Sequence, residues 1–160
     1  DLGSAQTRIT TAKVALDVIK DHPVLGVGMN NYGGKLAEYW IAEDSFTRYA
    51  AVHNTYLLIA AELGLLGLAA YIWLLIAFFT RIRRAYRGRA KFSKAVAVGV
   101  MGGFVAFLVT ALTDKSYKEN LTLLLVFWGL MALIEAINRL QAEHEDALVQ
   151  WTSDGRPNEF

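Results

Sequence analysis

Three long apolar runs constrain this chain more than any other feature of its sequence. They cover residues 56–79, 95–112 and 121–137, and a helix needs about 20 residues to cross the hydrocarbon core of a bilayer. The first run contains one charged side chain, Glu62, and the second contains none. Because the bilayer core has no water for unpaired backbone groups, apolar runs of this length cross it as helices. We therefore expect an all-α membrane protein with three transmembrane helices.

The charges around these runs predict their orientation. Residues 81–94 carry seven basic side chains and no acidic one, and the positive-inside rule places such a short basic loop in the cytoplasm. The connection at residues 113–120 has no basic excess and fits the opposite side. We therefore expect residues 1–54 to lie outside, residues 55–137 to form the membrane part, and residues 138–160 to form a cytoplasmic tail.

Composition excludes several classes of protein. None of the 160 residues is cysteine, which excludes disulfide frameworks, thiolate nucleophiles, iron–sulfur clusters and cysteine-ligated zinc. The three histidines, His22, His53 and His144, are too widely spaced in the sequence to suggest one metal site. A net charge of +1 gives no global basic field, although the basic loop alone would also fit a nucleic-acid patch. We expect no metal, no cofactor and no nucleic-acid partner.

The segment before the first apolar run has features of a folded region. Apolar residues recur at helical spacing over residues 7–21, and Pro23 ends that helix because the residue before a proline is pushed out of the α region. The Gly-x-Gly at residues 26–28 predicts a tight turn, since no strand precedes it and no third glycine completes a dinucleotide motif. A second short helix is expected over residues 30–41. This region would lie on the membrane and could cover a site.

His53 stands where this outer region meets the first apolar run. An imidazole titrates at about pH 6.5, so it can accept a proton from a hydroxyl at neutral pH. The alternative is an interfacial histidine that only solvates a helix start. Asn54, the next residue, could cap the helix or orient the imidazole.

Other charged residues are candidates for substrate binding. Arg8 opens the first helix, and its guanidinium fork suits phosphate and diphosphate oxygens, although a solvated surface arginine is the alternative. Lys35 and Arg48 are weaker candidates for the same anion site. Glu62 is a functional candidate because a carboxylate inside a membrane is costly, and on a continuous helix it would lie about 180° from His53.

Small residues in the apolar runs predict close packing. Gly64 and Gly67 lie in the first run, and Gly99 and Gly103 lie in the second. Glycine at a helix surface lets a neighbouring helix approach closely in a membrane.

Three pieces of the sequence together resemble the O-antigen ligase family. They are Arg8 with the helix that follows it, the run DHPVLGVGMNNY at residues 21–32, and the run HNTYLLIAAELGLLG at residues 53–67. The family consists of polytopic proteins of the bacterial inner membrane with a large periplasmic catalytic loop. The resemblance implies that residues 1–54 form a periplasmic helical loop region, followed by the three transmembrane helices. Because the chain starts without Met or a signal peptide, we expect a fragment of a larger polytopic protein.

The resemblance also implies a reaction. Family members transfer a preassembled glycan, without a metal, from an undecaprenyl-diphosphate carrier to a hydroxyl on a growing glycan, lipid A–core or a protein. His53 matches the proposed general base and Arg8 the arginine that holds the diphosphate. The family uses a further arginine from an earlier loop, which has no counterpart here, so we expect the isolated chain to be inactive. The alternatives are a lipid or polysaccharide transporter that relies on Glu62, and a membrane assembly subunit that binds partner helices through its glycines.

Overall fold

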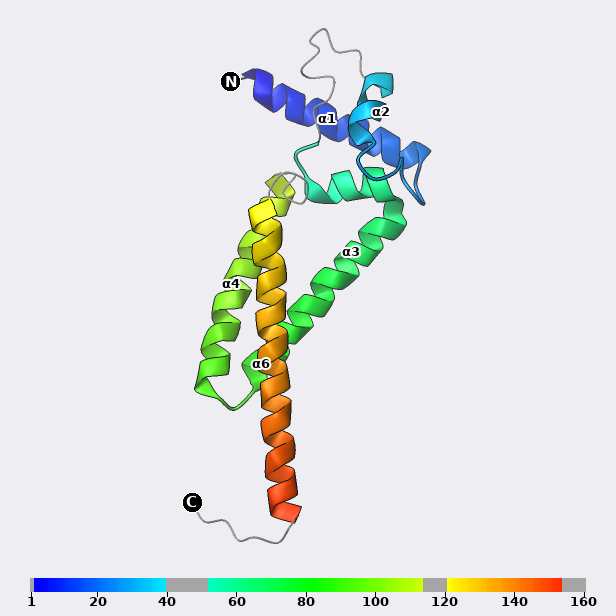
Figure 1. Ribbon diagram of the computed structural model, residues 1–160. Coiled ribbons are helices and arrows are strands. Elements are labelled where there is room, and N and C mark those ends of the chain that lie inside the picture. The colour runs from blue at the N-terminus through cyan, green and yellow to red at the C-terminus, as the bar shows by residue number, and fades with distance from the viewer. Residues whose placement is uncertain (1, 40–51, 114–120, 154–160) are drawn as a thin grey trace. The chain divides into compact units, whose positions relative to one another are not determined.

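The computed structural model describes residues 2–39, 52–113 and 121–153, and every regular element within those ranges is a helix. These helices are α1 (Leu2–Asp21), α2 (Tyr32–Tyr39), α3 (Thr55–Arg87), α4 (Lys91–Thr113) and α6 (Leu121–Ser153) (Figure 1). The helices α3, α4 and α6 are long and apolar enough to cross a membrane. The predicted all-α fold with three candidate spans is therefore confirmed.

The two short helices differ slightly from their predicted limits. The first begins at Leu2, five residues before the predicted start at Thr7. The second begins at Tyr32 because the left-handed φ of 65° at Asn30 continues the turn beyond the predicted start. Its predicted end at Ile41 lies outside the described residues.

The segment between the first two spans is more helical than expected. The basic loop predicted over residues 81–94 is mostly helix, since α3 continues to Arg87 and α4 starts at Lys91. Arginine, lysine and alanine are good helix formers, so the basic stretch does not end either helix. After the third apolar run, α6 continues unbroken to Ser153, so the described part of the tail is helical, as its sequence predicts.

The chain forms two compact units. The first comprises Asp1–Leu75 and Val105–Leu124, and the second comprises Ile76–Phe104 and Leu125–Phe160. In the second unit, Phe78 on α3 makes edge-on ring contacts with Phe104 on α4 and Phe127 on α6, at centroid distances of 5.1 and 5.4 Å. Through these contacts, one part of each of the three long helices packs around Phe78.

The first unit contains a folded N-terminal lobe, which we define as residues 2–39 and 52–63. Figure 1 shows α1 and α2 next to the first turns of α3. Their inward side chains form one apolar core, made of Val14, Ala15, Val18, Tyr32, Leu36, Val52, Leu58 and Ala61. Burying a leucine or valine of this kind contributes about 1.5–3 kcal/mol. The lobe is therefore a packed structure that can hold side chains in fixed positions.

Candidate functional site

The helix α3 is interrupted at Gly64. The φ of 70° and ψ of −175° at this residue are not helical, so the carbonyls before it and the amides after it lose their partners within the helix. Residues 23–28 supply the missing partners. The four main-chain hydrogen bonds are Val27 N to Ala61 O at 3.0 Å, Gly28 N to Glu62 O at 2.8 Å, Leu65 N to Pro23 O at 2.8 Å, and Leu66 N to Val24 O at 3.4 Å.

Glycine is required on both sides of this contact. Gly26 and Gly64 both have φ near 65–70°, and the combination of φ 70° with ψ −175° at Gly64 is adopted almost only by glycine and costs other residues about 1–3 kcal/mol. A side chain at Gly64 would overlap the carbonyl of Val24, and one at Gly26 would overlap the main chain of Glu62. The segment that packs closely against Gly64 is therefore the loop of residues 23–28, and not the neighbouring helix that the sequence predicts. The amides of Val27 and Gly28 serve this contact and do not face an open anion site.

Glu62 joins the break in α3 to the start of α2. Its side chain is fully buried, and its Oε1 accepts a hydrogen bond of 3.3 Å from the main-chain amide of Tyr32. The first amides of a helix have no partner within the helix and carry partial positive charge, so a carboxylate stabilises them. His53 precedes α3, which begins at Thr55, so the two residues do not lie on one continuous helix. The angle of about 180° predicted between Glu62 and His53 therefore does not apply. Glu62 thus has a clear structural contact within the lobe.

Tyr32 is a central side chain that sequence reasoning missed. It is fully buried, and its hydroxyl donates a 2.6 Å hydrogen bond to the carbonyl of Thr11 on α1. Burial raises the pKa of Tyr32 well above its usual range. Tyr39, at the other end of α2, donates a 2.5 Å hydrogen bond to the carboxylate of Asp21. The short helix α2 is therefore tied to α1 by a tyrosine at each end.

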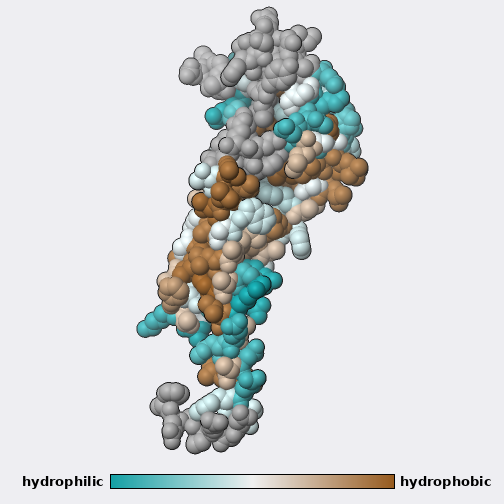
Figure 2. Space-filling model, viewed as in Figure 1, coloured by the Kyte–Doolittle hydropathy of each residue, from teal (hydrophilic) through white to brown (hydrophobic). Residues whose placement is uncertain are grey.

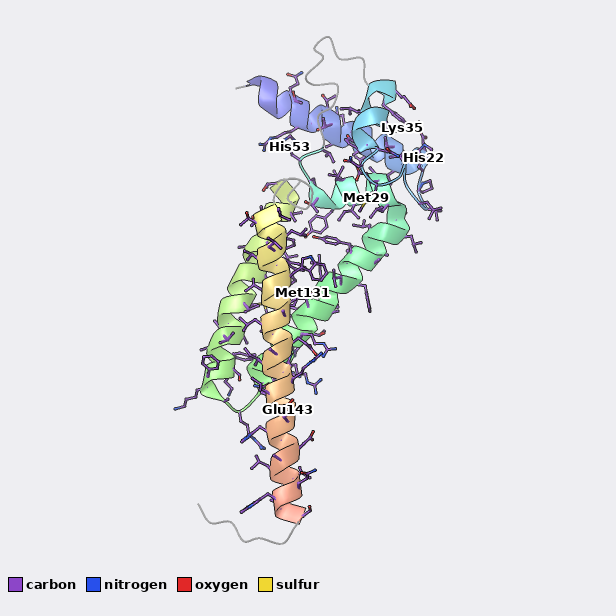
Figure 3. All side chains as sticks on the ribbon, viewed as in Figure 1. His22, Met29, Lys35, His53, Met131 and Glu143 are labelled. Carbon is purple, nitrogen blue, oxygen red and sulfur yellow. The ribbon has the colours of Figure 1, made fainter. Side chains whose placement is uncertain are left out.

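His53 lies on the segment that enters α3 (Figure 3). It is half-buried, and the residue before it, Val52, belongs to the apolar core of the lobe. The residue after it, Asn54, caps α3 by accepting a 3.0 Å hydrogen bond from the amide of Leu57 at its Oδ1. Its Nδ2 also donates to the carbonyl of Leu112 at the end of α4, at 3.1 Å. Asn54 therefore caps the helix, which is one of the two roles that the sequence leaves open for it, and both neighbours of His53 are held in place.

The three candidate cations have different surroundings. Arg8 lies on α1 with an exposed side chain, and its carbonyl accepts a 3.1 Å hydrogen bond from the hydroxyl of Thr11. Lys35 on α2 forms an ion pair with Glu38, at 2.8 Å to both carboxylate oxygens. Arg48 lies outside the described residues. Arg8 is therefore one of three exposed cations of α1, together with Lys13 and Lys20, and Lys35 has an acidic neighbour.

The elements that carry Arg8 and His53 meet in one core. Side chains of α1 pack with Val52, directly before His53, and with Leu58 in the first turns of α3. Within the described ranges, no group of three or more His, Asp or Glu side chains is placed to hold a metal ion.

A cavity of about 530 Å³ lies in the second unit. Its walls come from α4, α6 and the turn between α3 and α4, and include Arg89, Gln141 and His144. None of its lining residues is one of the candidates for catalysis or substrate binding that we identified in the sequence.

Part of the chain matches a known protein family. Residues 1–72 match the family described as O-Antigen ligase, and this range contains Arg8, His53 and both sides of the contact at Gly64. No curated protein and no solved structure matches the chain. The family suggests a ligase or polymerase type of function, and with the three apolar helices it points to a multi-pass membrane protein. The match supports membership of this chain in the O-antigen ligase family.

Proposed function

We propose that this protein transfers a glycan from an undecaprenyl-diphosphate-linked donor to an acceptor hydroxyl, at the periplasmic face of the bacterial inner membrane. The observation that carries the proposal is the family match over residues 1–72, which includes both Arg8 and His53. The three candidate spans support a membrane-bound donor. A growing glycan, lipid A–core and a protein are the acceptor classes that this chemistry admits.

In the proposed reaction, His53 is the general base. The acceptor oxygen bonds to the anomeric carbon of the donor glycan, the bond from that carbon to the diphosphate breaks, and the hydroxyl proton passes to the imidazole. One direct displacement of this kind inverts the anomeric centre. A positioned base contributes about 10²–10⁴ in rate. The half-buried position of His53 between a core residue and a helix cap supports this role, because a base must be held in place.

Arg8 is proposed to bind the diphosphate of the carrier. Charge develops on the leaving diphosphate as the bond breaks, and a cation placed there stabilises it. The side chain of Arg8 is exposed on α1, where an anionic substrate can reach it. Lys35 is a weaker candidate because Glu38 already neutralises it, and Arg48 remains a sequence-based proposal.

Asn54 is proposed to assist substrate binding through the position of His53. Its amide oxygen caps α3 and its amide nitrogen bonds the end of α4, so both ends of the amide serve the protein fold. The side chain therefore fixes the backbone directly after the proposed base.

The test is His53→Ala at the chromosomal locus of the host, with His22→Ala as a matched control. His22 is an exposed histidine in the turn after α1. We expect lipid-linked donor to accumulate and finished surface glycan to disappear in His53→Ala, with the protein level unchanged by immunoblot. His22→Ala should resemble wild type. Wild-type levels of both pools in His53→Ala would refute the role of His53 as a base.

The same assay separates a transferase from a transporter. A transporter that relies on Glu62 should tolerate His53→Gln and lose function in Glu62→Gln. A transferase should lose function in His53→Gln and tolerate Glu62→Gln. The second variant is tolerated because glutamine at position 62 still offers an oxygen to the amide of Tyr32.

A further inference from the structure

Five exposed apolar side chains lie close to the break in α3. Val24, Leu25 and Met29 of the loop have exposed fractions of 63%, 71% and 68%, and Leu65 and Leu66 of α3 have 51% and 63%. Main-chain hydrogen bonds from Leu65 and Leu66 to the loop place these two groups together. Figure 2 shows hydrophobic surface gathered in this part of the lobe. We call these five residues the loop patch.

The backbone of the loop is unusually well paired for an irregular segment. The carbonyls of Pro23 and Val24 accept from α3, and the amides of Val27 and Gly28 donate to it. The amide of Gly26 donates to the carbonyl of His22 at 3.1 Å. An irregular backbone is tolerated at the level of a membrane only where its polar groups have partners in the protein. The loop meets that condition at five of its main-chain groups.

The side chains of the loop divide into an inner and an outer set. Val27 packs against the core of the lobe, whereas Val24, Leu25 and Met29 point outward. Residues 23–34 contain no charged side chain. A solvated loop gains nothing from exposing three large apolar side chains, whereas a lipid interface stabilises them.

The position of the loop along α3 indicates that lipid covers the loop patch. Leu65 is the first residue after the break, and the exposed apolar surface continues along the same helix at Ile72 and Trp73. Because α3 is a candidate span, we expect these exposed apolar side chains to face lipid. The loop patch is therefore continuous with a lipid-facing surface, and the hydrogen bonds to Leu65 and Leu66 hold it where the unbroken part of the span begins.

We propose that residues 23–29 form a wedge that inserts into the membrane. The wedge enters the acyl region of the leaflet in which the unbroken part of α3 begins. Leu25 and Met29 enter the lipid while Val27 anchors the loop to the lobe. The wedge fixes the lobe, and the segment that carries His53, at the membrane surface. This inference rests on the fold and not on the proposed reaction.

None of these 160 residues is cysteine, so single labels can be placed here in a full-length background whose cysteines elsewhere are replaced by serine. Single variants Leu25→Cys and Met29→Cys would carry a nitroxide spin label in the full-length protein, reconstituted in nanodiscs of zwitterionic and anionic phospholipid. Trp73→Cys, which is 70% exposed on the span, is the lipid-facing control. Lys13→Cys, exposed on α1, is the water-facing control. The measurement is the collision rate of each label with oxygen, which concentrates in lipid, and with a water-soluble nickel chelate.

We expect the labels at positions 25 and 29 to resemble the label at position 73, with a ratio of oxygen to nickel collisions several-fold above that at position 13. A ratio equal to that at position 13 would show a solvated loop and overturn the proposal. Protection from both reagents would show that protein covers the patch, and would also overturn it. All four side chains are exposed in the structure, so folding is not at risk from the label, and a thermal unfolding scan of each variant verifies this.

Discussion

The carbonyl oxygen of Val24 fills the space that a side chain at Gly64 would need. This relationship joins the loop after α1 to the third turn of α3, 40 residues later in the chain. It explains why α3 breaks where it does, because the loop supplies hydrogen bonds to the groups that the break exposes. The proposed base lies on the segment directly before this braced part of α3.

Gly64→Ala should therefore destabilise the lobe more than an ordinary glycine replacement. The backbone conformation of Gly64 alone costs alanine about 1–3 kcal/mol, and the overlap with Val24 adds to that cost. Gly99→Ala is the matched control, since a side chain there would meet nothing within 4 Å. In mid-helix that change should be neutral or stabilise the helix by about 0.5–1 kcal/mol. Thermal unfolding of the purified protein in detergent compares the two, and equal midpoints would contradict the contact.

Glu62→Leu should destabilise the lobe by about 1–3 kcal/mol, because it leaves the buried amide of Tyr32 without its acceptor. Glu62→Gln keeps an oxygen at that position and should therefore lose much less stability. The measurement is the unfolding midpoint of each variant, together with the activity of the fraction that remains folded. An activity lost in Glu62→Gln at unchanged stability would show that the carboxylate has a chemical role beyond this contact.

The sequence predicts the helices better than it predicts the break. Apolar spacing and length identify α1 and the three spans because these signals are local. Gly64 and Gly67 stand in nearly the same local sequence, yet only Gly64 leaves the helical conformation. The difference comes from residues 23–28, which are distant in sequence, so no reading of the apolar run alone could find it.

The candidate site shows the same division. Asn54 was predictable as a cap because the capping pattern spans only a few residues, whereas its bond to Leu112 joins two helices far apart in sequence. The contact between Glu62 and Tyr32 joins residues that are 30 positions apart in the sequence. From the sequence alone, a single carboxylate in an apolar run indicates a functional residue, and its structural partner cannot be seen. Tyr32 itself gave no sequence signal beyond its place after a turn.

Asn54→Ala should lower both stability and transfer activity. The loss of a helix cap costs about 1 kcal/mol, and the loss of the bond to Leu112 frees the segment that carries His53. Asn54→Ser is the informative partner, because a serine hydroxyl can still cap α3 but is too short to replace the amide that reaches Leu112. We expect Asn54→Ser to recover the stability of the cap and only part of the activity. Full activity in Asn54→Ala, assayed by surface glycan at matched protein level, would refute a positioning role.

Alkaline pH should loosen the lobe through its two tyrosines. Burial raises the pKa of Tyr32, and the hydrogen bond to Asp21, followed by burial, raises the pKa of Tyr39 to about 12. An unfolded tyrosine titrates at about 10, so above that pH the folded state holds more protons than the unfolded state. Stability is then fully present below pH 10 and falls as the pH rises toward the folded pKa values. Unfolding midpoints measured from pH 8 to 12 should decline in wild type and decline less in the double variant Tyr32→Phe and Tyr39→Phe. Tyr86→Phe, an exposed position on α3, should keep the wild-type slope, and a double variant with that same slope would contradict the assignment to these tyrosines.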